Sequence, residues 1–278
     1  MDSKAKGLEL SPTPPFYLAP FHMISNLRKN RSLLRNFISR DFKVNYHGHV
    51  LGYFWSLLEP LVLTGIFFLV FIILRGSSDT MLPLKIMIGI LIFNSFSRTL
   101  SNCTSCLIQN SSLIKQIYFP REIFPASIAG FRLISLCMSM AIIIPYMIYE
   151  SLYPTQLLLL LPVAMVSGIM LGQGIGMIAS IIQVRIRDVK QIIDLALRAA
   201  FFLSGVFYGA EIIPAEYLHL FFLNPIAVYI EMARAAVIGD LGVLQFSNIF
   251  ISVLISILVF IIGSIVFVKC ERKAVKYL

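Results

Sequence analysis

Basic residues occupy alternate connections between long apolar runs, and this distribution limits the possible folds more than any other feature. Lys and Arg crowd the first 52 residues, the stretches 115–121 and 185–190, and the tail from Lys269. The other connections, around 75–80 and 150–155, hold one basic residue, Arg75. Cytoplasmic loops of membrane proteins carry an excess of Lys and Arg. The pattern therefore predicts a polytopic membrane protein with both termini in the cytoplasm.

The composition agrees with a chain that dissolves in lipid. Hydrophobic residues make up 58% and charged residues only 13% of the 278 residues, whereas soluble domains carry about 25% charge. The net charge of +9 lies beside apolar runs, where anionic headgroups attract it, so we do not expect nucleic-acid binding. Cys103 and Cys106 form a C-x-x-C without a second pair or a His cluster. We interpret them as packing residues and expect no metal site.

Six apolar runs approach the length of about 20 residues that a membrane-spanning helix needs. We expect an all-α polytopic membrane protein with spans at about 53–74, 82–101, 123–149, 152–182, 191–209 and 246–268. Residues 1–20 are predicted to form a flexible arm, and residues 21–278 a single transmembrane domain. Between spans five and six, Pro214 and Pro225 interrupt pieces too short to cross. We predict a re-entrant hairpin of short helices there, over about 212–240, on the outer face.

Residues 21–43 alternate apolar and basic side chains. Leu27, Leu34 and Ile38 fall at helical spacings between arginines and lysines. This pattern predicts an amphipathic helix at about 22–43 on the cytoplasmic leaflet, with a plain solvated helix as the alternative.

No sequence pattern points to catalysis. The 278 residues contain no G-x-x-x-x-G-K-[ST] and no evident Ser/His/Asp or Cys/His set, so we expect neither an enzyme nor a bound cofactor. Small residues recur every four positions in the fourth span, at Ala164, Gly168, Gly172, Gly176 and Ser180. Such a ridge lets two helix backbones approach closely.

Charged residues within or beside the apolar runs are Glu59, Arg132, Asp194 and Arg198. Charges at membrane depth are usually paired or face a water-filled path. Asp194 can pair with Arg198, and Glu231 with Arg234, at helical spacings. Structural pairing and contact with a transported anion both remain open.

Aromatic residues gather in two places, at Tyr53, Phe54 and Trp55 before the first span and at Phe201, Phe202, Phe207 and Tyr208 in the fifth. They suit an interface belt or lipid contact, and also the apolar faces of sugar rings. The short basic stretches 113–125 and 183–190 suit the docking of a soluble partner, or reflect only the charge rule.

Taken in order, several motifs resemble one family. They are RDFKVNY at 40–46, LGYFWSLLEP at 51–60, FPREIFP at 119–125, RDV at 187–189, and LNP at 223–225 with Arg234 downstream. The chain resembles the membrane subunits of type-2 ATP-binding-cassette exporters of O-antigen, teichoic acid or capsular polysaccharide. The resemblance covers nearly the whole chain from about residue 30. His49 departs from it, because relatives often have a small or hydroxyl residue there.

The resemblance implies an inner-membrane homodimer with a channel between its subunits. It implies two copies of a separate ATPase subunit, which bind the ATP and Mg²⁺, and a polyprenyl-diphosphate-linked glycan as substrate. The residues expected to couple to the ATPase are Arg28, Arg31, Arg35, Arg40, Lys115, Phe119, Arg121, Glu122, Arg185, Arg187 and Asp188. Arg40 and Lys43 are expected at the entrance for the lipid diphosphate. The sugar path is expected along Tyr53, Phe54, Trp55, Phe201, Phe202, Phe207 and Tyr208. The outer gate is expected at Glu211, Pro214, Asn224, Pro225, Glu231 and Arg234.

Two transporter alternatives stay open, and an enzyme is disfavoured. A type-2 exporter of drugs or small lipids shares the expected fold. An ATPase-independent carrier needs a carboxylate near mid-membrane, for which Asp194 is the candidate. An integral membrane enzyme needs acidic or His-rich loops on one face, which the sequence does not show.

Overall fold

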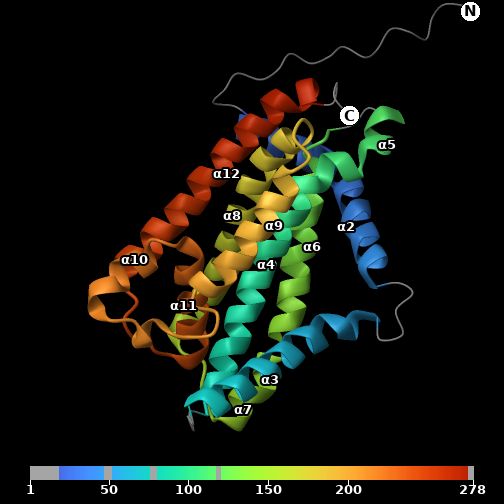
Figure 1. Cartoon of the computed structure of the whole chain (residues 1–278). Coiled ribbons are helices and arrows are strands. Elements are labelled where there is room, and N and C mark those ends of the chain that lie inside the picture. The colour runs from blue at the N-terminus through green and yellow to red at the C-terminus, as the bar shows by residue number, and fades with distance from the viewer. Residues whose placement is uncertain (1–18, 47–51, 76–79, 117–119, 275–278) are drawn as a thin grey trace, which may run out of the picture.

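The computed structural model describes residues 19–46, 52–75, 80–116 and 120–274, and every regular element in these ranges is a helix (Figure 1). The all-α prediction is therefore confirmed. The expected arm at 1–20 falls almost wholly outside the described residues, as do His49 and Phe119.

Helices α4 (Leu82–Gln109) and α8 (Leu160–Gln183) form the centre of the bundle and share its most extensive contact. The predicted ridge on α8 produces this contact. A Cβ added at Gly172 would lie 2.8 Å from the carbonyl oxygen of Phe96, and one at Gly176 would lie 2.5 Å from the Cβ of Cys103. Only glycine allows the two backbones to approach so closely, so the packing role of the ridge is confirmed.

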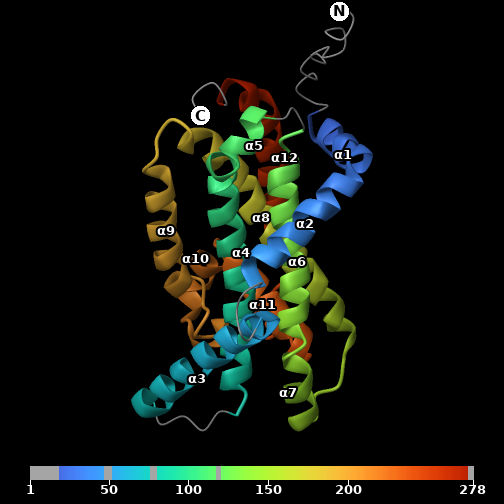
Figure 2. The same ribbon diagram turned by 90° about the vertical axis from the view of Figure 1, so that its right-hand side faces the viewer.

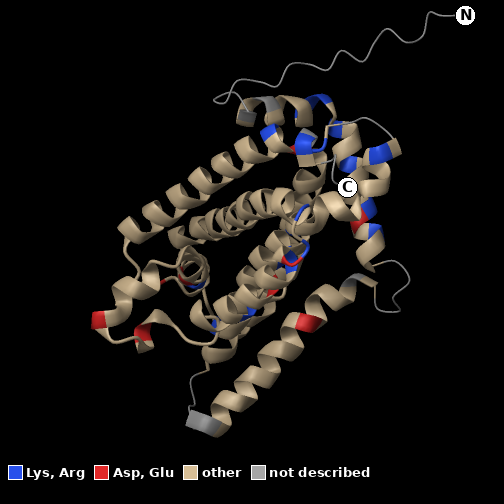
Figure 3. Cartoon of the chain, turned by 45° about the horizontal axis from the view of Figure 1, so that its top comes forward, with Lys and Arg blue, Asp and Glu red and all other residues tan. Residues whose placement is uncertain are grey.

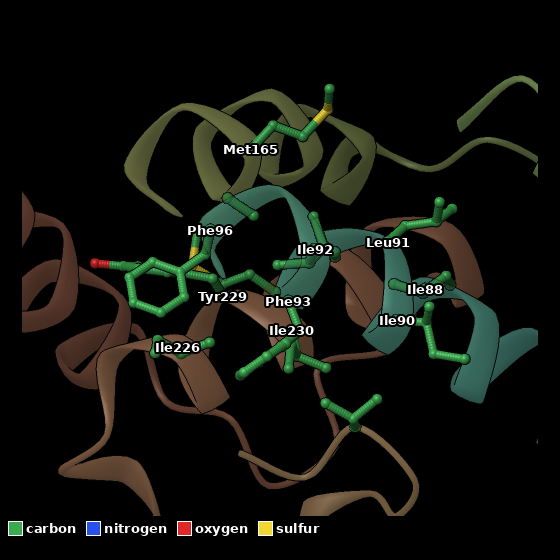
Figure 4. Close-up of a cluster of buried hydrophobic side chains, with 14 of the residues drawn as sticks. Ile88, Ile90, Leu91, Ile92, Phe93, Phe96, Met165, Ile226, Tyr229 and Ile230 are labelled. Carbon is green, nitrogen blue, oxygen red and sulfur yellow. The ribbon is translucent and has the colours of Figure 1, made fainter. Parts of the chain in front are cut away.

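The other side of α8 packs against α12 (Phe246–Ala274) through a second pair of glycines. A Cβ at Gly263 would lie 2.3 Å from the carbonyl oxygen of Gly174. Helix α11 (Pro225–Ile238) completes the core against both α4 and α8. Figure 4 shows Ile226, Tyr229 and Ile230 of α11 among the isoleucines and phenylalanines of α4.

Helices α3 (Trp55–Arg75) and α9 (Val189–Leu203) lie at the periphery and contact α4 from different sides (Figure 2). Of α9, only Leu197 is buried. Most of the side chains described on α3 are also at least partly exposed. Both helices therefore present largely apolar surfaces that the single chain leaves uncovered.

Helix lengths agree only partly with the expected spans. Four segments are long and apolar enough to cross a membrane: Trp55–Ile73, Ile123–Tyr149, Gln156–Gln183 and Phe246–Glu271. Helix α4 is long enough but has a polar face, and α9 has only 15 residues. The count of six spans therefore stays a prediction.

Several expected segments have different boundaries, each with a local cause. The expected helix at 22–43 is two helices, α1 (Ala19–Lys29) and α2 (Arg31–Tyr46). At the junction, Asn30 lies in a turn, and its backbone N–H and its side chain both donate to the carbonyl of Asn26 at 2.9 Å. The third segment keeps its expected bounds as one apolar span, Ile123–Tyr149, but its helix is broken between α6 (Ile123–Met140) and α7 (Ile143–Tyr149). Pro145 has no N–H for the carbonyl of Ala141, four residues earlier.

The ends of two further helices, α4 and α9, differ from the expected span boundaries. Helix α4 does not stop near residue 101, because the polar stretch that follows stays helical to Gln109, with the hydroxyl of Thr104 satisfied by the carbonyl of Leu100 at 2.7 Å. Helix α9 ends at Leu203, not at 209, since Gly205 adopts a left-handed conformation with φ of 69°. The fourth helical segment begins at η3 (Gln156–Leu159), after Ser151 with φ of 55°.

The segment expected as a re-entrant hairpin contains η4 (Ala210–Ile212), η5 (Ala215–Tyr217), α10 (Leu218–Phe222) and α11. The chain bends by 105° between Ala215–Phe222 and Pro225–Ile238. Asn224 starts α11 by accepting the N–H of Ile226 at 3.1 Å, and Pro225 occupies the first turn, where no N–H is needed. Whether this bent pair enters the membrane stays a prediction.

One end of the bundle carries most of the cations (Figure 3). At this basic end lie α1, α5 (Ser111–Gln116), the turn at 184–188 and the end of α12 (Figure 1). Helix α1 contacts α12 there, so the first and last described helices meet at the same end. Helix α7 and the end of α3 lie at the opposite end.

Candidate functional site

The less buried face of α4 is mainly polar from Asn94 onward. The polar side chains on this face, at least partly exposed, are Asn94, Ser97, Arg98, Ser101, Asn102 and Gln109, and Ile108 is an apolar member. The first five recur at helical spacings and Gln109 follows two turns later, so they share one side of the helix, while α8 covers the other. A helix that faced only lipid would be apolar there. This polar face of α4 is the main candidate site, and α3 and α9 flank it.

Charged residues from both flanking helices bind to the polar face. Arg98 pairs with Glu59 of α3. Asp194 of α9 accepts from the hydroxyl of Ser101 at 3.0 Å and pairs with Lys190 at 2.7 Å. The expected Asp194–Arg198 pair is therefore wrong. Ser101 of α4 holds the carboxylate on the side of α9 that Lys190 also reaches, whereas Arg198 is exposed.

An aromatic cluster lies beyond Arg98, towards the end of the bundle opposite the basic end. Phe201 contacts Phe93 of α4 and Phe207, with ring centroids 5.1 and 4.9 Å apart. The ring of Phe67 of α3 contacts that of Phe207 at an angle of 44°, with centroids 4.0 Å apart. The expected clustering of Phe201, Phe202 and Phe207 is confirmed. The ring of Tyr208 contacts Phe221 instead, with centroids 6.1 Å apart, while its hydroxyl donates to the carbonyl of Phe202 at 3.2 Å.

These aromatics differ in what they can contact. Phe207 is 6% exposed and packs in the core, whereas Phe202 is 61% exposed. At the start of α3, Phe54 and Trp55 are about half exposed, while the side chain of Tyr53 lies outside the described residues. Their expected place along a sugar path stays a prediction.

The residues expected to couple to an ATPase divide into exposed and anchored groups. The exposed ones are Arg28, Arg31, Arg35, Lys115, Arg185, Arg187 and Asp188. Glu122 is only 3% exposed and accepts from Asn26 of α1 at 3.4 Å. Arg121 lies 3.8 Å from Glu271 of α12. Anchored residues of this kind fasten the surface helices to the bundle.

The two residues expected at a lipid-diphosphate entrance also differ. Arg40 pairs with Asp41 at 2.9 Å, donates to Asn110 at 3.3 Å and lies 4.4 Å over the ring of Phe37. It therefore joins α2 to the turn after α4. Lys43 is exposed.

Arg234 is the centre of a buried network at the opposite end. The predicted Glu231–Arg234 pair is confirmed, at 2.8 Å. Arg234 is 3% exposed and also donates to four carbonyl oxygens, those of Lys85, Gly205, Val206 and Tyr208, at 2.8 to 3.0 Å. Glu231 accepts in addition from the N–H of Ala210 at 3.0 Å. The network fixes the turn after α9 to α4 and α11.

Other residues expected at an outer gate lie around this network. Asn224 donates to the hydroxyl of Ser204 at 2.9 Å. Glu211 pairs with Lys85 at 3.3 Å, and Pro214 is exposed. Within the described residues, no group of three or more His, Cys, Asp and Glu side chains is arranged to hold a metal ion.

Sequence reasoning missed the Arg98–Glu59 pair and the role of Ser101. The signal was present, because Asn94, Arg98, Ser101 and Ser105 follow a helical period. The end of the apolar run concealed it, since the helix was expected to stop there.

Comparison with known proteins agrees on one family. The sequence profile of ABC-2 type transporters matches residues 32–238. The O-antigen export system permease protein RfbA of Klebsiella pneumoniae is 24% identical over 236 residues, which cover 84% of this chain and 90% of the relative. A protein of the same name from Myxococcus xanthus is 24% identical over 194 residues, covering 70% and 75%. The polysialic acid transport protein KpsM of Escherichia coli is 26% identical over 207 residues, covering 71% and 78%.

Proposed function

The chain belongs to the ABC-2 type transporter family, and from this premise we propose that it is the transmembrane subunit of an ATP-driven polysaccharide exporter. The substrate is a glycan on a polyprenyl-diphosphate lipid, and the location is the cytoplasmic membrane. The names of the relatives support the substrate class, since they refer to O-antigen export and polysialic acid transport. The polar face of α4 is the observation that carries the proposal.

A polysaccharide needs a continuous hydrated path, because a polymer longer than the bilayer cannot ride in a closed pocket. Asn94, Ser97, Arg98, Ser101 and Asn102 offer such a path one polar wall. Neutral amides and hydroxyls donate to and accept from sugar hydroxyls. The cations at this face, Arg98 and Lys190, already pair with Glu59 and Asp194. A neutral glycan is therefore held here by hydrogen bonds and not by charge.

The second wall comes from another copy of the chain. Helices α3 and α9 leave broad apolar surfaces on either side of α4. A two-fold dimer that buries these surfaces encloses two copies of the polar face in one channel. Burial of apolar surface drives such association outside lipid, and close packing drives it within the bilayer.

Two copies of a separate ATPase subunit supply the energy and bind the ATP and Mg²⁺. They dock at the basic end, which in this proposal is cytoplasmic. The exposed turn with Arg185, Arg187 and Asp188 connects α8 directly to α9. A push on this turn is thus transmitted to a helix beside the polar face. Arg121, through Glu271, links the same end to α12.

The proposal is tested in cells that make a surface polysaccharide and lack this chain. We expect surface polymer to disappear and lipid-linked polymer to accumulate inside. The chain restores export only with an active ATPase partner, and an ATPase with an inactivated nucleotide site does not support it. Normal surface polymer without the chain, or export that does not depend on ATP, contradicts the proposal.

A further inference from the structure

A small polar cavity lies among α2, α3, α4 and α6, beside the polar face of α4. Its volume is about 50 Å³, and Tyr46, Glu59, Asn94, Ser95, Arg98 and Arg132 are among the residues that line it. Cavities of this size in an apolar bundle are normally apolar or filled by a polar partner. This one holds two arginines.

Arg132 is the unusual member. It is 9% exposed, and its Nε has no hydrogen-bond partner although the atom is fully buried. The hydroxyl of Ser95, on the facing helix, is buried and unpartnered as well. An unsatisfied buried donor costs about 1–3 kcal/mol, and more when it is charged. Two such donors at one cavity therefore indicate a site for an acceptor that the described residues do not supply.

The charges around the cavity identify the kind of acceptor. Glu59 is the one carboxylate among its lining residues, and it already pairs with Arg98. The second arginine is left without a counter-charge in the lining. An anion with several oxygens satisfies the guanidinium of Arg132 and the hydroxyl of Ser95 together.

The cavity lies towards the basic end of α4. Arg98 lies 11 residues before the end of α4 at Gln109, about 16 Å along the helix. Since α4 spans about 42 Å and exceeds the roughly 30 Å hydrocarbon core by about 12 Å, a helix that projects only at its basic end places Arg98 about 4 Å inside the core. Tyr46 ends the amphipathic helix α2 at the cavity, and the half-exposed Phe54 and Trp55 lie in the next segment. Aromatic residues of this kind mark membrane interfaces.

The first turns of α3 are shaped to leave this site open. Pro60 has no N–H to give the carbonyl of Ser56. The hydroxyl of Ser139, on α6, lies 3.3 Å from that carbonyl oxygen. Tyr46 contacts Ser135 of α6 at 3.2 Å. Ser135 and Ser139 of α6 thus make these two contacts, and neither contact uses the Nε of Arg132 or the hydroxyl of Ser95. The guanidinium of Arg132 also lies 4.9 Å over the ring of Phe131.

We propose that this cavity binds the phosphoryl anion of a lipid, held by Arg132 and Ser95, with Arg98 at its edge. The source is a bilayer phospholipid or the phosphate end of a polyprenyl carrier. The site requires a membrane, but it does not require that the chain exports a polysaccharide. An experiment that disproves this lipid site therefore does not disprove polysaccharide export, and the reverse also holds.

Native mass spectrometry of the full-length chain in detergent tests this site. The probes are phosphatidylglycerol, undecaprenyl phosphate, diacylglycerol, which has no phosphate, and inorganic phosphate as competitor. We expect retention of the two phosphate lipids but not of diacylglycerol. R132Q should lower that retention about tenfold, because a charge-assisted hydrogen bond is lost. The matched control R198Q, at an exposed arginine of α9, should retain lipid as the wild type does.

We expect a second variant to change lipid retention in the opposite direction. E59Q removes the carboxylate that competes for Arg98, so it should raise retention of phosphate lipid, and it keeps the test valid if R132Q does not fold. Displacement by inorganic phosphate means that phosphate alone is a sufficient ligand, whereas resistance to it means that the site takes the lipid. Preference between the two lipids identifies the source. Equal retention in wild type, R132Q and E59Q, or equal retention of diacylglycerol, overturns the proposal.

Discussion

At the scale of single residues, Arg234 shows how a buried charge is made tolerable. Its guanidinium directs hydrogen bonds at Glu231 and at four carbonyl oxygens, and its side chain is 3% exposed. Gly89 makes room for it, because a Cβ there would lie 3.1 Å from Nη2 and 2.6 Å from the carbonyl of Val206. The residue thus secures the turn that ends α9.

Arg234→Gln should destabilise the protein strongly, by about 3–5 kcal/mol, since it leaves Glu231 and several carbonyls buried without a partner. Arg234→Lys should recover only part of the loss, because one ammonium cannot reach all five acceptors. The loss is measured as the temperature at which the monodisperse peak in size-exclusion chromatography falls to half. Arg198→Gln is the control, and an unchanged midpoint in Arg234→Gln contradicts the assignment.

Pairing could be predicted only where both partners lie on one helix and nothing else intervenes. Glu231 and Arg234 are three apart on α11, and their pair was predictable. Asp194 has helical neighbours at both 190 and 198, so its sequence does not choose between them. The choice comes from Ser101, 93 residues away on α4. The unsatisfied Arg132 was likewise visible only once four helices had been placed together.

At the scale of helices, glycine contacts decide which pairs approach most closely. Gly263→Ala should cost about 1–3 kcal/mol, because its methyl group would overlap the backbone of Gly174, and α8 and α12 must separate to admit it. Gly65→Ala is a matched control in α3, where an added Cβ meets nothing within 4 Å. We expect Gly65→Ala to be neutral or slightly stabilising, since alanine favours the helix.

The measurement is the same thermal midpoint for both glycine variants. Equal midpoints for the two variants would contradict the close backbone approach of α8 and α12 at Gly174 and Gly263. The four-residue ridge on α8 was predictable because small residues in an apolar helix carry a packing signal. Gly174 and Gly263 were not paired in advance, since nothing in either helix identifies its partner.

The turn between α8 and α9 is the element on which ATPase coupling is predicted to act. The variant with both Arg187→Glu and Asp188→Arg should lower export severalfold while leaving membrane insertion and thermal stability unchanged, because both side chains are exposed. Export is measured as surface polymer, and expression as the amount of chain in membranes. Normal export by this variant contradicts a coupling role for the turn.

Helix ends were the least predictable elements, for local reasons. The polar stretch at the end of α4 stays helical although composition alone places it in a loop, and Thr99 and Thr104 satisfy their hydroxyls there on carbonyls four residues earlier. Conversely, Pro145 and Gly205 end helices inside apolar runs that hydropathy treats as continuous.

At the scale of the whole molecule, the basic end should lie in the cytoplasm. Single cysteines at Ser32 and Lys273, introduced into a chain without Cys103, Cys106, Cys137 and Cys270, should react with an impermeant maleimide only after the membrane is opened. A cysteine at Glu216, at the opposite end, should react in intact cells. All three positions are exposed. Labelling of Ser32→Cys and Lys273→Cys on different sides of the membrane contradicts this orientation.

The arrangement of the bundle was predictable in class but not in detail. Charge distribution and apolar runs predicted an all-helical membrane protein, and the ordered motifs predicted its family. The polar face of α4 was not predicted as a path. Its function depends on which sides α8, α3 and α9 cover, and that is a property of packing rather than of one segment.

The most direct test of the account is whether a glycan touches this polar face during export. A photoreactive phenylalanine analogue replaces Ser101 on α4, or Ile262 on the exposed side of α12 as control. After illumination of exporting cells, the purified chain is probed for attached polysaccharide. We predict attachment at position 101 that requires an active ATPase, and none at position 262. Attachment at 262 but not at 101, or attachment at neither position while export proceeds, contradicts the path along α4.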